Sequence, residues 1–202
     1  MNTQTYLQFH SYNCLSKNPK LIEMLVHAYQ DVFGDPKLWN EHYSSGQVLA
    51  SLQSGLTGKA GIRLCLAGQK LMAFCWAQQL HVRAIEEAVL SIDYVRQHGG
   101  ADPGDMLRKV IGDKAVIYLH DLGISQQHRG KVSLSELICP LLSELAGRCQ
   151  NSRLFFWSIA DSRVFRLAER AGFDMVADIN GLQFFYGDLN NRKLQNLAVF
   201  RH

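Results

Sequence analysis

Two spacings of apolar residues alternate along the chain, and together they predict an α/β protein. Apolar residues recur every three to four positions where a helix would bury one face, and they form short continuous runs where a strand would be buried. Gly, Pro, Asn and Asp separate these stretches. In the first half of the chain, the predicted elements are helices at 19–33 and 45–52, strands at 62–66 and 71–76, and helices at 82–97 and 106–111, with one more strand near 6–9. In the second half, they are a strand at 115–122, a helix at 134–145, a strand at 153–159, a helix at 162–171, and strands at 173–177 and 182–186.

The order of these elements predicts the fold class. Strand–helix–strand units in the second half indicate parallel pairing, because parallel strands need a crossover between them. The hairpins at 62–76 and 173–186 add antiparallel pairs. We therefore expect an α/β fold with three layers, a mixed and partly parallel β-sheet, and helices on both faces. Residues 1–189 would form a single domain with an inserted helical segment around 80–114, followed by a C-terminal tail at 190–202.

Local signals support several helix ends. Asn18 is a common N-cap residue, and Pro19 suits the first helical position. Asp161 is expected to cap a helix that Gly172 ends as a C′ residue. Pro140 lies inside a predicted helix, where its missing N–H predicts a bend.

Composition excludes several functional classes. Of the 202 residues, 47% are hydrophobic and 19% charged, which is typical of a globular domain. A net charge of +3 is too small for a nucleic-acid-binding face, and no apolar run approaches the ~20 residues that cross a membrane. The five cysteines and eight histidines show no metal-ligand spacing, so we expect reduced thiols and no metal. No signal peptide is recognisable, which predicts a cytoplasmic protein.

The stretch QQHRGKVSLSELI at 126–138 is the clearest candidate site. A predicted strand ends in a basic turn, which leads into the N-terminus of a helix. Unpaired backbone N–H groups and the helix dipole favour an anion there. Arg129 and Lys131 add two positive charges, which suits a diphosphate. Taken alone, the pattern is more often an ordinary solvated turn.

The surroundings of this turn resemble a known family. The motifs are Gln127-x-x-Gly130, the overlapping Arg129-Gly130-Lys131 and, after the next strand and helix, Ala171-Gly172-Phe173. In this order they resemble the GNAT superfamily of N-acetyltransferases over residues 115–187, and the first half resembles it in layout.

The resemblance implies acetyl-CoA as cosubstrate. The loop would bind its pyrophosphate through backbone amides, and the end of the preceding strand would hold the pantetheine arm and the thioester carbonyl. The cofactor-binding residues implied are Leu122, Gly123, Ile124, Gln127, Arg129, Gly130, Lys131, Val132 and Ser133.

Three positions depart from the family pattern. Val132 stands where a second glycine or alanine is usual, and Leu134 where many members have a further glycine. A β-branched side chain near the pyrophosphate could crowd it. Ser133 could compensate with a hydroxyl donor or could simply begin the helix. Ala168 replaces the tyrosine that in many members protonates the departing thiolate.

The resemblance also suggests the catalytic residues. Asp121 matches an acidic residue of the family and is the first candidate for the base, with His120 second. The ordinary pKa of histidine suits this role better, but His120 could be a half-buried hydrogen-bonded residue and Asp121 a loop cap. Strand neighbours point to opposite faces, so we expect only one of them to face the acceptor. Gly123 suits either a close approach of another chain or a β-bulge.

The acceptor side is predicted less directly. Trp39 and Glu41 belong to a run that in some family members borders the acceptor pocket, where they could contact an amine. For Trp39, packing between helices is the more ordinary explanation. The insertion at 80–114 could form a lid or an oligomer surface, and a homodimer is one outcome.

Three hypotheses follow. The leading one is an acyl-CoA-dependent N-acyltransferase that moves acetyl to a primary amine of a small molecule or a protein by direct attack. The alternative is a GNAT-fold binding or sensor domain without efficient transfer, which the changes at Val132, Leu134 and Ala168 favour. The third is an unrelated mixed α/β domain.

Overall fold

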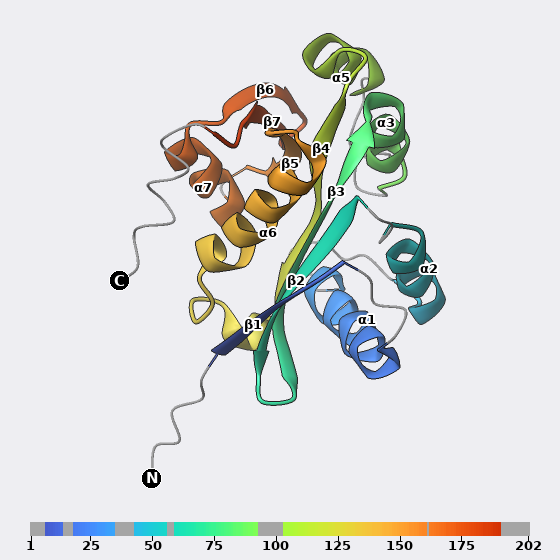
Figure 1. Cartoon of the computed structure of the whole chain (residues 1–202), viewed down its shortest axis with the longest axis vertical. Coiled ribbons are helices and arrows are strands. Elements are labelled where there is room, and N and C mark those ends of the chain that lie inside the picture. The colour runs from blue at the N-terminus through green and yellow to red at the C-terminus, as the bar shows by residue number, and fades with distance from the viewer. Residues whose placement is uncertain are drawn as a thin grey trace. The chain divides into compact units, whose positions relative to one another are not determined.

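The structure, a computed structural model, describes residues 7–13, 18–34, 43–55, 59–92, 103–160 and 162–190. Figure 1 shows the course of the chain. The elements are β1 (Leu7–Tyr12), α1 (Pro19–Phe33), α2 (Ser45–Gly55), β2 (Ala60–Ala67), β3 (Lys70–His81), α3 (Val82–Leu90), α5 (Pro103–Ile111), β4 (Ala115–Ile124), the 3-10 turn η1 (Gln126–His128), α6 (Leu134–Cys149), β5 (Arg153–Ile159), α7 (Arg163–Ala171), β6 (Asp174–Ile179) and β7 (Leu182–Asp188).

The strands form one mixed sheet in the order β1-β2-β3-β4-β5-β7-β6. β4 and β5 run parallel, with Ile117 opposite Leu154. The pairs β1–β2, β2–β3, β5–β7 and β6–β7 are antiparallel. The predicted mixed sheet is therefore confirmed. The chain divides into two compact units, Met1–Gln78 with His120–Leu141 and Gln79–Leu119 with Leu142–His202, and each is described by itself.

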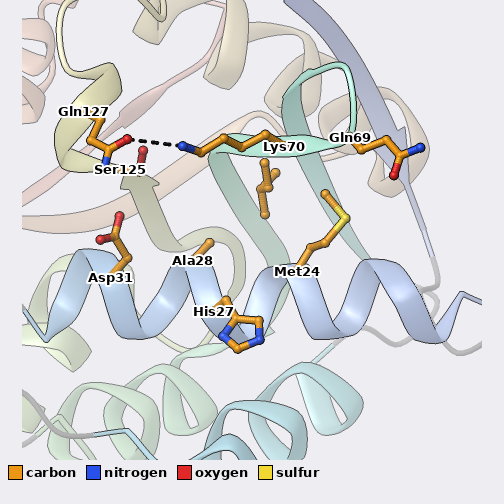
Figure 2. A pocket seen from close by; sticks show the side chains of 9 residues that line it. Met24, His27, Ala28, Asp31, Gln69, Lys70, Ser125 and Gln127 are labelled. Atoms are coloured by element: carbon orange, nitrogen blue, oxygen red, sulfur yellow. Dashed lines mark hydrogen bonds between the residues drawn. The ribbon is translucent and has the colours of Figure 1, made fainter.

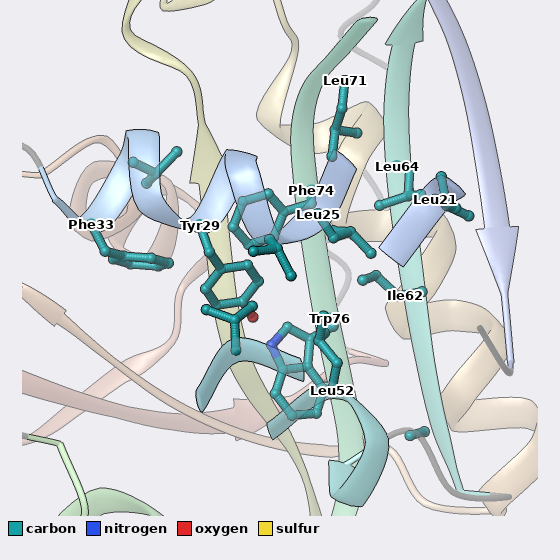
Figure 3. Close-up of a cluster of buried hydrophobic side chains, with 14 residues drawn as sticks. Leu21, Leu25, Tyr29, Phe33, Leu52, Ile62, Leu64, Leu71, Phe74 and Trp76 are labelled. Atoms are coloured by element: carbon teal, nitrogen blue, oxygen red, sulfur yellow. The ribbon is translucent and has the colours of Figure 1, made fainter. Parts of the chain in front are cut away.

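In the first unit, α1 and α2 cover one face of the β2–β3 hairpin. The antiparallel register places Ile62 opposite Trp76 and Leu64 opposite Phe74, so these four side chains share one face. They form a buried cluster with apolar residues of both helices (Figure 3). On the opposite face, Arg63 donates from Nε to the carbonyl of Glu136 in α6 at 3.0 Å.

In the second unit, the inserted helices are part of the core. Val82, Ile85 and Val89 of α3 and Leu107 and Ile111 of α5 are buried together with side chains of β4, β5 and β7. The guanidinium of Arg108 contacts both carboxylate oxygens of Glu86, at 2.8 and 2.7 Å, and so joins α5 to α3. On the other face of the sheet, Phe165 of α7 packs against Phe185 of β7. Each unit thus has helices on both faces of its strands.

The predicted N-cap of α1 is confirmed, and the predicted N-cap of α7 is wrong. Asn18 caps α1 through Oδ1, which accepts from the N–H of Leu21 at 3.1 Å. The N-cap of α7 is Ser162, whose Oγ accepts from the N–H of Phe165 at 2.9 Å, while Asp161, the predicted cap, lies outside the described residues. α6 continues as one helix past Pro140.

Several other predicted boundaries differ, including the ends of α3 and β4. α3 ends at Leu90, with Ser91 as its C-cap, and not at 97; residues 93–102 lie outside the described part. The predicted strand at 115–122 extends to Ile124, so the whole Leu122–Ile124 segment is extended backbone.

Gly172 ends α7 in the left-handed conformation, with φ of 73°. We expect Gly172→Ala to lower the free energy of unfolding by about 1 kcal/mol, because an L side chain is disfavoured in that region. Gly147 is the matched control: it lies inside α6, where an added Cβ meets open space. Gly147→Ala should raise the free energy of unfolding by roughly 0.5–1 kcal/mol. Urea unfolding of the wild type and the two variants measures both changes in free energy. Changes of the same sign in the two variants would contradict the left-handed conformation of Gly172.

Candidate functional site

The loop between β4 and α6, residues 125–133, is held by backbone hydrogen bonds to β3 and within the loop itself. Ser125 donates its N–H to the carbonyl of Met72 in β3 at 3.0 Å, and the N–H of Lys131 reaches the carbonyl of His128 at 3.0 Å. Gly130 has a φ of 88°, a conformation that a side chain would strain. This is the physical reason for the glycine in the predicted phosphate-binding motif.

The side chains of this loop divide into two groups. Gln127, Arg129 and Lys131 are exposed, so both predicted cations reach solvent. Val132 is buried, with 6% of its surface exposed. Its side chain therefore packs into the protein and does not project from the exposed surface of the loop.

Ser133 has a structural role at the start of α6. Its Oγ accepts from the N–H of Glu136 at 3.4 Å and lies 2.9 Å from the Oγ of Ser135. Of the two roles predicted for Ser133, the structure thus shows the helix-start role.

His128, which the sequence did not single out, fixes the loop from inside. It is buried, and its Nδ1 lies 2.5 Å from the Oγ of Ser125. Burial lowers the pKa of His128, and the nearby charges of Lys70 and Lys131 lower it further, against a smaller opposing effect of Asp31. The folded protein therefore favours the neutral ring.

A pocket of about 310 Å³ lies beside the beginning of this loop (Figure 2). α1 forms one wall with Met24, His27 and Asp31, and the start of β3 forms another. Lys70 extends along the pocket and donates from Nζ to Oε1 of Gln127 at 3.2 Å. The tip of the β2–β3 hairpin is thereby connected to Gln127, the first residue of the predicted phosphate-binding motif.

Asp121 is the centre of a polar cluster in the first unit. Its Oδ2 accepts from the hydroxyl of Tyr29 at 2.7 Å and from Nε1 of Trp76 at 2.7 Å. The Nδ1 of His120 lies 3.2 Å from the same oxygen. Three elements, α1, β3 and β4, therefore meet at one carboxylate oxygen.

The electrostatics of the cluster keep this carboxylate ionised. Burial alone would raise the pKa of Asp121, but the charge and hydrogen bond of His120 and the donors of Tyr29 and Trp76 together lower it below its usual value. Burial and the charge of Asp121 raise the pKa of Tyr29 well above its usual value, so the phenol stays protonated as a donor.

His120 and Asp121 do not follow simple strand alternation. The imidazole of His120 stacks on Trp76, with ring centroids 3.9 Å apart and planes inclined by 19°, and Asp121 accepts from the indole of the same tryptophan. Adjacent strand residues normally point to opposite faces. Here both contact one side chain, and both are about a quarter exposed.

Gly123 has a packing role that the sequence analysis did not identify. A Cβ at this position would lie 2.4 Å from Cε1 of Phe74. Phe74 in turn stacks on Tyr29, with centroids 4.5 Å apart. The missing side chain of Gly123 therefore makes room for the ring that supports Tyr29. Leu122 and Ile124 are half-buried on either side.

The remaining residues that the sequence singled out are Trp39, Glu41 and Ala168. Trp39 and Glu41 are outside the described residues. Ala168 is buried in α7, and its carbonyl accepts from the N–H of Phe173 at 3.1 Å. Sequence reasoning missed Tyr29 and Trp76, which lie in the predicted helix at 19–33 and the predicted strand at 71–76. The signal was their chemistry, because a buried phenol or indole usually needs a hydrogen-bond partner.

No three His, Cys, Asp or Glu side chains come together as a metal site would require, within the ranges that the structure describes. No helix in the same ranges is long and apolar enough to cross a membrane.

Comparisons with known proteins show similarity of structure. No model of a protein family matches the chain, and no curated protein matches its sequence. Among solved structures, NAA60 of Arabidopsis thaliana in complex with acetyl-CoA has a TM-score of 0.58 and 17% identity, covering 92% of this chain and 99% of that one. The ribosomal-protein-S18-alanine N-acetyltransferase of Escherichia coli has a TM-score of 0.57 and 11% identity, covering 91% and 94%. A protein of Desulfovibrio desulfuricans assigned to the GNAT family has a TM-score of 0.54 and 8% identity, covering 91% and 99%. At such identities the similarity is one of fold.

Acidification should destabilise the protein partly through His128. As the pH falls below about 6.5, the unfolded chain binds a proton that the buried ring resists, so the free energy of unfolding decreases. We expect the loss between pH 7.5 and pH 5.5 to be smaller in His128→Gln than in the wild type. His10→Gln, which removes a half-buried histidine of β1, is the control. Urea unfolding at the two pH values measures these free energies. Equal losses in the wild type and His128→Gln would contradict the role of His128 in acid destabilisation.

Proposed function

We propose that this chain, whose fold is that of the GNAT acetyltransferases, is an acyl-CoA-dependent N-acyltransferase that moves acetyl from acetyl-CoA to a primary amine. The observation that carries the proposal is the loop that leads from β4 into the N-terminus of α6. It combines Gly130 in a positive-φ conformation with two exposed cations, Arg129 and Lys131. Such a helix N-terminus suits a diphosphate.

The departures from the family pattern are compatible with this use. Val132 is buried, so its side chain does not occupy the exposed side of the loop where a phosphate would bind. The amides of Gln127 to Ser133 would contact the pyrophosphate. The extended backbone of Leu122 to Ile124 would hold the pantetheine arm, and residues 1–189 would work as one domain.

The chemistry requires a neutral amine and a stabilised leaving group. A base removes a proton from the ammonium, the amine attacks the thioester carbonyl, and the thiolate leaves. Ala168 cannot donate a proton, but thiols have a pKa of ~8.5, so a thiolate is a tolerable leaving group without an acid. Asp121 and His120 are the candidates for the base, and Trp39 and Glu41 would border the amine, which could be a small molecule or a protein terminus.

Calorimetric titration with acetyl-CoA tests the cofactor site. We expect micromolar binding by the wild type and a loss of roughly tenfold or more in Arg129→Ala, because a hydrogen bond to a charged group contributes about 1.5–3 kcal/mol. Arg83→Ala removes the same charge from an exposed position of α3 and should bind as the wild type does.

The same titration separates the enzyme from its alternative. Binding together with thiol release from acetyl-CoA in the presence of a panel of primary amines and free N-terminal peptides would support transfer. Binding without turnover of any amine would favour a sensor domain, for which Ala168 provides a reason. No binding by the wild type would contradict the acyltransferase and favour a domain that does not transfer acetyl.

A further inference from the structure

We propose that the proton acceptor of the reaction is Nε2 of His120, and that Asp121, Tyr29 and Trp76 are positioning residues that fix the tautomer and orientation of its ring. The inference rests on the proposed function and deepens it. It assigns to Asp121 a different role from the one that sequence alone favours.

Asp121 is poorly suited to accept a proton from substrate. Its Oδ2 already has three polar partners within 3.2 Å. An indole N–H can only donate, and the raised pKa of Tyr29 keeps its hydroxyl a donor. Each donor stabilises the ionised carboxylate and so lowers its basicity.

The same contacts determine the tautomer of His120. An ionised carboxylate only accepts hydrogen bonds, so the nitrogen that faces Oδ2 of Asp121 at 3.2 Å must carry the proton. In the neutral ring, the proton on Nδ1 leaves the lone pair on Nε2. A carboxylate that holds a histidine in one tautomer is a general arrangement for base catalysis.

Packing fixes the direction of the ring as well as its tautomer. His120 lies flat on Trp76, and Trp76 is only 1% exposed. Figure 3 shows Tyr29 from α1 and Trp76 from β3 presenting their polar atoms toward the same space. The imidazole itself is 23% exposed, so it is supported from the core and still reaches solvent.

In this reaction the amine attacks directly, with His120 as the base. Nε2 removes one proton from the substrate ammonium, and the neutral amine forms a C–N bond with the thioester carbonyl carbon. The C–S bond breaks with its electron pair on sulfur, and the surplus proton of the new amide nitrogen goes to the thiolate. The imidazolium returns its proton to water. Within the described ranges, the titratable groups that interact with His120 or its neighbours in the cluster include Asp121 on β4, Tyr29 on α1, Tyr43 before α2 and Cys75 on β3.

Nitrogen-15 NMR of histidine-labelled protein tests the tautomer without any substrate. The signals of His120 are identified by their loss in His120→Gln. We expect Nδ1 protonated and Nε2 unprotonated at pH 7.5, and a shift toward the opposite tautomer in Asp121→Ala, which removes the acceptor. Tyr29→Phe keeps the shape of the site and should preserve the tautomer. Nε2 protonated in the neutral ring of the wild type would overturn the proposal.

Kinetics with acetyl-CoA and the best amine of the panel test the role. We expect His120→Gln to lower kcat by roughly 100-fold or more, to remove the acidic limb of the pH–rate profile, and to leave acetyl-CoA binding unchanged. His10→Gln is the control. Retention of kcat and of the acidic limb in His120→Gln would exclude His120 as the base. No turnover of any amine would overturn the proposed function, and the role of His120 with it, while the NMR result would still report on the cluster.

Discussion

The candidate site depends on the hydrogen bonds that the carboxylate of Asp121 accepts from the hydrophobic core. Two core side chains, Tyr29 and Trp76, donate to one oxygen of this carboxylate at 2.7 Å. A buried charge is stable only when it is paired and hydrogen-bonded, and here the partners come from α1 and β3. The site residues of β4 are therefore positioned by the hydrophobic core of the first unit, whose helices and strands have to assemble before the carboxylate can be satisfied.

Much of the fold could be predicted from the sequence because its elements have strong local signals. Asn18 and Pro19 mark the start of α1, and the turn of Gly68 with φ of 61° marks the β2–β3 hairpin. The end of α3 was misplaced because apolar spacing continues beyond Leu90, where the chain already leaves the helix at Ser91. The spacing of apolar residues predicts which side of a helix is buried, but it does not predict where the helix ends.

The candidate site could be predicted only in part, for a different reason. The loop motif is local, so Gln127, Gly130 and the two cations could be found by reading along the chain. The Asp121 cluster joins residues 45 and 92 positions apart, and their side chains have ordinary apolar neighbours in sequence. The buried Val132 shows the same limit, because a substitution in a motif cannot reveal which way its side chain points.

The contact between Gly123 and Phe74 couples the side-chain sizes that are allowed at two positions distant in sequence. The ring occupies the space that any side chain at 123 would need, so the two positions are not independent during evolution. A larger residue at 123 becomes tolerable only after the aromatic ring at 74 has been replaced by something smaller, and that change removes the stacking support of Tyr29. Among related proteins that keep the Tyr29–Asp121 hydrogen bond, glycine at 123 and an aromatic residue at 74 should therefore be conserved together.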